Sequence, residues 1–173
     1  MMKKRDILLA AGIIAIALLA MLFLSQRKGY IKVETLGVEL HLRGGLGGGV
    51  TVRSGSRAVA VPARKYRPRR LQITARENGS TWKLLSQGPW GTLNRVAVAS
   101  GETTSINVGP PLRISPEVRS YHGRVSIGWS IYGRAGEQYQ NIVWKNDRRV
   151  AAPQLRIIDR EGRVLASGRF RYG

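Results

Sequence analysis

An unbroken apolar run near the N-terminus constrains this chain more than any other feature. The 18 residues from Ile7 to Leu24 include no charged or strongly polar side chain. At 1.5 Å per residue a helix of that length spans about 27 Å, close to the ~30 Å hydrocarbon core of a bilayer. A helix of a soluble domain would carry a polar face, and this run has none. The run therefore predicts a single transmembrane helix.

The residues that flank this run predict an uncleaved anchor. A signal-peptide cleavage site needs small side chains, whereas the run ends in Phe23 and Leu24 before Ser25. The short tail with its basic residues 3–5 is expected to stay in the cytoplasm. We therefore expect residues 1–26 to form a cytoplasmic tail and signal anchor, with the C-terminal domain periplasmic or on the cell surface.

Beyond residue 27 the sequence has the alternation typical of half-buried β-strands. Apolar and polar side chains alternate over residues 31–35, 38–43 and 71–76, and β-branched residues are frequent. Turn dipeptides such as Asn78-Gly79 and His122-Gly123 separate these runs. Many short strands at this spacing predict an all-β fold, an antiparallel Greek-key β-sandwich.

A break at residues 109–111, Gly-Pro-Pro, divides this β-rich part of the chain. Residues 27–109 are expected to form a β-sandwich module. Residues 110–173 would then form a second β-module, or complete the same sandwich. The sequence leaves both arrangements open, because the two halves share no clear internal repeat.

Residues 59–108 carry a weak family resemblance. The stretch 61–66, Val-Pro-Ala-Arg-Lys-Tyr, leads into a strand, and the stretch 96–108 contains Val-Ala-Val-Ala-Ser-Gly-Glu-Thr. This order resembles the carboxypeptidase-regulatory-like and PEGA-like β-sandwich modules of bacterial surface proteins. The resemblance implies a β-sandwich in the bacterial envelope with an accessory or binding role and no enzyme activity.

The chain is strongly basic, with 29 Lys and Arg against 10 Asp and Glu and a net charge of +19. The densest cluster places five cations within seven residues: Arg64, Lys65, Arg67, Arg69 and Arg70. Pro68 favours an extended backbone there, so the segment could follow an anionic polymer or lie on anionic lipid. The alternative is a solvated edge strand, in which charge and proline prevent aggregation.

Trp90 is a second candidate binding residue. It lies in the turn sequence Gly88-Pro89-Trp90-Gly91, where an exposed ring could serve as a platform for a sugar or a protein. The alternative is that the ring packs against a small core, as buried aromatic residues commonly do.

Other residue types argue against catalysis and metal binding. The chain has no cysteine, and its only histidines are His41 and His122, without a recognisable nucleophile motif beside either. The glycine-rich run 44–49 has no Gly-Lys pair after it and is interpreted as a hairpin loop rather than a phosphate loop. We therefore expect no enzyme activity, no metal and no cofactor.

Together these features predict a single-pass membrane protein that acts as a non-catalytic binding or assembly module. Its partner would be another envelope protein, or an anionic polymer or lipid. The alternative is a basic β-module that binds nucleic acid, which the predicted location outside the cytoplasm disfavours.

Overall fold

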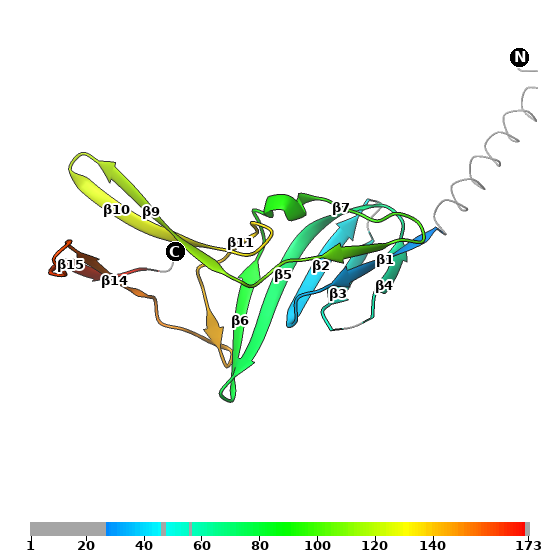
Figure 1. Cartoon of the computed structure of the whole chain (residues 1–173), viewed down its shortest axis with the longest axis horizontal. Coiled ribbons are helices and arrows are strands. Elements are labelled where there is room, and N and C mark those ends of the chain that lie inside the picture. The colour runs from blue at the N-terminus through cyan, green and yellow to red at the C-terminus, as the bar shows by residue number, and fades with distance from the viewer. Residues whose placement is uncertain (1–26, 46–47, 56, 172–173) are drawn as a thin grey trace, which may run out of the picture.

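The computed structural model describes residues 27–45, 48–55 and 57–171 (Figure 1). Within these ranges the chain is all β, as predicted: it consists of strands, turns and one short 3-10 helix, η1 (Gly91–Asn94). No helix in the described ranges is long and apolar enough to cross a bilayer. The predicted anchor, residues 1–26, lies outside the described residues.

The larger sheet contributes half of the buried core residues of the described chain. Its strands lie in the order β13-β12-β6-β5-β2-β3, and the short β7 also pairs with β5. Their bounds are β2 (Val38–Gly44), β3 (Gly49–Arg53), β5 (Lys65–Glu77), β6 (Ser80–Ser86), β7 (Val96–Ala97), β12 (Trp144–Lys145) and β13 (Arg148–Arg149). The Asn78-Gly79 turn joins β5 to β6 with both residues at positive φ, which is the geometry expected of a two-residue hairpin.

A smaller sheet has the order β4-β1-β8, with bounds β1 (Lys28–Val33), β4 (Val59–Pro62) and β8 (Thr103–Ile106). β1 and β4 are antiparallel, but β1 and β8 are parallel. The expectation of a purely antiparallel fold is therefore wrong at this pair. More than 60 residues connect the end of β1 to the start of β8, and a connection of this length allows the two strands to pair in parallel.

The inward faces of these two sheets share one hydrophobic core. The smaller sheet contributes residues such as Ile31 and Val61, and the larger sheet contributes Leu40, Leu71 and Leu84. Each of these side chains belongs to the apolar half of an alternating strand, so alternation in the sequence directly specifies the buried face. The two sheets form a sandwich-like arrangement.

The part of the chain after residue 110 both extends the larger sheet and departs from it. β12 pairs with β6, and Tyr139 of β11 (Gln138–Tyr139) is buried in the main core. Two hairpins, β9–β10 (Arg113–Tyr121 and Arg124–Tyr132) and β14–β15 (Gln154–Ile158 and Val164–Arg169), lie at the end of the molecule opposite the start of β1 (Figure 1).

A buried carboxylate ties the two halves together. Glu137 is fully buried, and its Oε1 accepts hydrogen bonds from the backbone N–H of Gly109 at 2.6 Å and from the Tyr139 hydroxyl at 2.8 Å. Its Oε2 accepts the backbone N–H of Ala135 at 2.9 Å. Burial, reinforced by the charge of Glu137, raises the pKa of Tyr139 far above its usual range, so this hydroxyl remains a donor. A Cβ at Gly133 would collide with Oε1 of Glu137, which explains the glycine there.

Candidate basic cleft

The outward face of the larger sheet holds a row of arginines. Arg43 of β2 lies directly opposite Arg67 of β5. On the other side of β5, Lys65 pairs with Ala97 and Tyr66 with Val96, so the antiparallel register carries Arg95 toward Arg67. Three neighbouring segments thus place an arginine in one row, although like charges opposite each other in a sheet are destabilising.

A bulge in β5 adds two further cations to the same face. The even-numbered residues Tyr66 and Pro68 point inward at the start of β5. After the bulge the odd-numbered residues Leu71 and Ile73 point inward instead. The phase changes because the register shifts between His41, opposite Arg70, and Leu42, opposite Pro68, leaving Arg69 without a cross-strand partner. Arg69 and Arg70 are consequently both exposed, whereas strict alternation would bury one of them.

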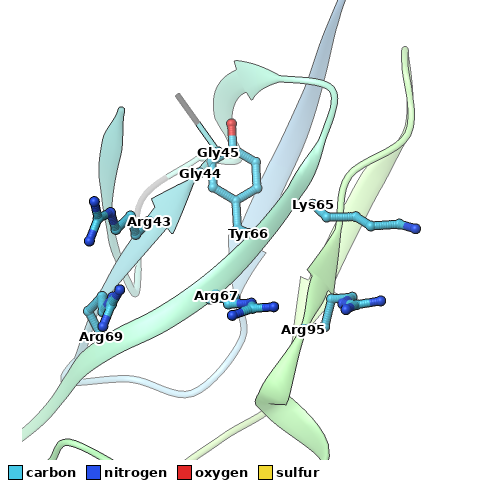
Figure 2. A pocket seen from close by; sticks show the side chains of 8 residues that line it. All are labelled: Arg43, Gly44, Gly45, Lys65, Tyr66, Arg67, Arg69 and Arg95. Carbon is cyan, nitrogen blue, oxygen red and sulfur yellow. The ribbon is translucent and has the colours of Figure 1, made fainter. Parts of the chain in front are cut away.

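These residues surround a cleft of about 500 Å³, which we call the basic cleft. It is lined by Arg43, Gly44, Gly45, Lys65, Tyr66, Arg67, Arg69 and Arg95. Figure 2 shows Arg43 and Arg69 on one side of β5 and Lys65, Arg67 and Arg95 on the other. All five cationic side chains belong to exposed residues.

The nearest acid on this sheet face is already engaged elsewhere. Glu39 accepts a hydrogen bond from Arg53 Nε at 2.6 Å and lies 2.8 Å from His41 Nε2. The bond from Arg53 holds the pKa of Glu39 below its usual range, so Glu39 stays ionised and neutralises Arg53. Among the described residues, no ion pair within 4.0 Å joins an acid to any of the five cations of the cleft. The cleft therefore presents concentrated, uncompensated positive charge.

Two of the five cations predicted from sequence lie outside the cleft. Arg70 donates a hydrogen bond to Gln72 Oε1 at 3.2 Å. Arg64 packs over the Tyr66 ring at 5.2 Å and against the β2–β3 loop, where a Cβ at Gly44 would lie 2.5 Å from its Nε. Gly44 ends β2 and Gly49 begins β3, so the described ends of the glycine-rich run agree with the interpreted hairpin, and the lack of side chains at Gly44 and Gly48 makes room for the Arg64 guanidinium.

Sequence reasoning missed Arg43 and Arg95. Arg43 follows inward-facing Leu42, so strand alternation could have assigned it to the outward face. Arg95 has no comparable local signal, because its position depends on the pairing of β7 with β5, about 30 residues away along the chain.

Trp90 does not have the free ring expected of a platform. It is half-buried and packs against the main hydrophobic core at the start of η1. The structure thus favours the packing interpretation of Trp90 over the sugar or protein platform.

The described residues include no group of three or more His, Cys, Asp or Glu side chains placed to hold a metal ion. The cleft itself contains cations, one tyrosine and two glycines, and therefore offers donors and positive charge to an anion. No protein-family model, curated protein or solved structure matches this chain.

The arginine row predicts a gain in stability when one member is neutralised. Arg67→Gln should stabilise the soluble fragment 27–173 by about 0.5 kcal/mol at low ionic strength, because it relieves repulsion from Arg43 and Arg95. The gain should shrink at high salt, where the repulsion is screened. Urea unfolding of both proteins at two salt concentrations measures this effect. A destabilised variant would show that Arg67 instead supports the fold.

Proposed function

We propose that this chain is a membrane-anchored, non-catalytic binding module whose basic cleft holds an anionic group of an envelope component. The observation that carries this proposal is the row of Arg43, Arg67 and Arg95 across three neighbouring segments. A fold gains nothing from opposing like charges, whereas a bound phosphate or carboxylate would neutralise them and accept their hydrogen bonds.

Arginine chemistry suits an anion with several oxygens. Each guanidinium offers a planar set of donors that can bind two oxygens of one phosphate, and it keeps its charge at any physiological pH. Lys65 and Arg69 line the same cleft and add further charge on the two sides of β5 (Figure 2). An anionic lipid headgroup and a phosphate-rich polymer share this chemistry, and they differ in whether a membrane surface is needed.

Binding of the soluble fragment 27–173 to defined probes tests this proposal. The probes are phosphatidylglycerol vesicles, phosphatidylcholine vesicles, soluble polyphosphate and duplex DNA, each at low and high salt. We expect binding to phosphatidylglycerol or polyphosphate that falls steeply as salt rises, because each neutralised phosphate releases counterions. Preference for duplex DNA would favour the nucleic-acid alternative, and binding to phosphatidylcholine alone would contradict an anion site.

The proposed anchor at residues 1–26 has a separate test. We expect the full-length protein to remain in the membrane pellet through high salt and alkaline carbonate, because the run from Ile7 to Leu24 matches the bilayer core in length. Deletion of residues 1–26 should release the protein into the supernatant. A full-length chain that washes off in carbonate is not anchored by a spanning helix.

A further inference from the structure

An apolar groove of about 730 Å³ opens between the two hairpins and the uncovered end of the larger sheet. Its walls include Ile114, Ile127 and Trp129 of β9–β10, Leu155 of β14, and Trp82 of β6. The groove is distinct from the basic cleft, with which it shares no lining residue. Polar atoms contribute almost nothing to its surface.

The β9–β10 hairpin is amphipathic along its whole length. Ile114 lies opposite Ile131 and Val118 lies opposite Ile127, which places all four side chains on one face. The residues between them along both strands form the opposite, polar face. The base of the apolar face lines the groove, and the rest continues toward the hairpin tip.

The outer part of this apolar surface is uncovered. Val118 and Val125 near the tip of β9–β10 are 66% and 61% exposed, and Val164 and Leu165 of β15 are 57% and 65% exposed. Exposed apolar surface beside an apolar groove indicates an interaction site, and the outer part of each hairpin, where only two strands pair, is at best marginally stable without further packing. Both hairpins thus expose apolar side chains that a bound partner would cover.

β9 also has a free backbone edge, since it is the outermost strand of the order β11-β10-β9. Proline cannot donate a hydrogen bond to the β9–β10 ladder, so the nitrogen of Pro116 belongs on the outer side of the strand. In an antiparallel pair the backbone groups alternate between the two sides, which places the N–H groups of Val118 and Ser120 on the same outer side. These two amides are available to an added strand.

Charge on the two hairpins, outside the groove, selects the partner. Arg113, Arg124, Arg156 and Arg160 are exposed cations of the two hairpins, and no ion pair within 4.0 Å engages them in the described part of the chain. The hairpin acids, in contrast, are paired: Glu117 lies near Arg119, and both Asp159 and Glu161 lie near Arg163. A second copy of this chain would bring the same positive charge to the interface, whereas an acidic segment would complement it.

We propose that the groove and the outer edge of β9 bind an extended, acidic segment of a partner protein as an added strand. Its apolar side chains enter the groove and cover Val118 and Val125, while its carboxylates, on the other face of the added strand, lie on the polar side of the hairpin with Arg113 and Arg124. This inference rests on the proposed function in that it names the protein partner of the binding module, but it concerns a surface other than the basic cleft.

The test uses the full-length chain in phosphatidylcholine nanodiscs and two synthetic nine-residue peptides. One peptide alternates Val with Glu, and the control alternates Val with Lys. We expect the Glu peptide to bind at least tenfold more tightly than the Lys peptide. We also expect it to slow amide hydrogen exchange at Val118 and Ser120 at least tenfold, without a comparable change at Arg119, which already faces β10.

A double variant separates this surface from the cleft. Val118→Ser with Val125→Ser should weaken binding of the Glu peptide at least tenfold and leave binding of inorganic pyrophosphate to the same full-length chain in nanodiscs unchanged. Equal binding of the two peptides, absence of binding, or absence of protection at Val118 and Ser120 overturns the inference. Protection of these amides by self-association, without peptide, would assign the surface to a second copy instead. Either result leaves the basic cleft untouched.

Discussion

Replacing Arg43, Arg67 and Arg69 by glutamine should weaken binding of the soluble fragment 27–173 to phosphatidylglycerol vesicles by roughly 100-fold at low salt. Each basic side chain near an anionic surface contributes on the order of 1 kcal/mol, and 1.4 kcal/mol is a tenfold change in affinity. Glutamine keeps the length and polarity of the side chain, so the substitution removes charge without opening the core.

A matched variant controls for overall charge. Arg57, Arg76 and Arg148 are exposed arginines that do not line the cleft, and their replacement by glutamine removes the same charge from the chain. If non-specific attraction by the net charge of +17 on the fragment explained binding, both triple variants would lose affinity equally. We expect the control to lose less than about threefold. Equal losses of affinity in vesicle co-sedimentation would contradict a specific role of the cleft in binding.

Removing the buried carboxylate of Glu137 should strongly destabilise the described part of the chain. Glu137→Ala leaves three donors without their acceptor, namely the buried N–H group of Gly109, the buried Tyr139 hydroxyl and the partly buried N–H group of Ala135. Each such donor costs about 1–3 kcal/mol, so we expect a loss of about 4 kcal/mol in unfolding free energy.

A graded series of substitutions tests whether the lost hydrogen bonds cause this loss of stability. Glu137→Gln keeps the shape but turns an NH₂ group toward one donor, and should cost about 2 kcal/mol, while Tyr139→Phe removes one donor and should cost about 1 kcal/mol. The exposed Glu102→Gln change should stay within about 0.5 kcal/mol. Urea unfolding of the fragment measures the series. A Glu137→Ala protein as stable as the Glu102 variant would contradict the role of this carboxylate.

The strand content of the fold could be predicted from the sequence because alternation and turn chemistry are local. Asn78-Gly79 and His122-Gly123 occupy the two-residue turns of β5–β6 and β9–β10, each with both residues at positive φ. The parallel pairing of β1 with β8 could not be predicted in this way, because it joins segments more than 70 residues apart and leaves no local signal.

The candidate site likewise combines features that the sequence shows locally with features that depend on long-range strand pairing. The density of cations from Arg64 to Arg70 was visible in the sequence, but not which of them share a cleft. The bulge at Arg69 and the insertion of Arg64 between Tyr66 and the glycine loop depend on neighbouring strands. Arg95 joins the site only through the pairing of β7. The sequence therefore showed which residues are cationic. Which of these side chains point into the cleft depends on the pairing of strands that are distant in the sequence.

The most direct measurement of the anion site follows arginine side-chain Nε–H signals by NMR while inorganic pyrophosphate is added to the fragment 27–173 at low salt. We predict that the signals of Arg43, Arg67 and Arg95 shift together along one saturable curve that weakens as salt is added. The signals of Arg57, Arg76 and Arg148 should remain in place. Shifts of equal size in both sets, or no shift in the cleft, would contradict the proposal that this cleft binds anions.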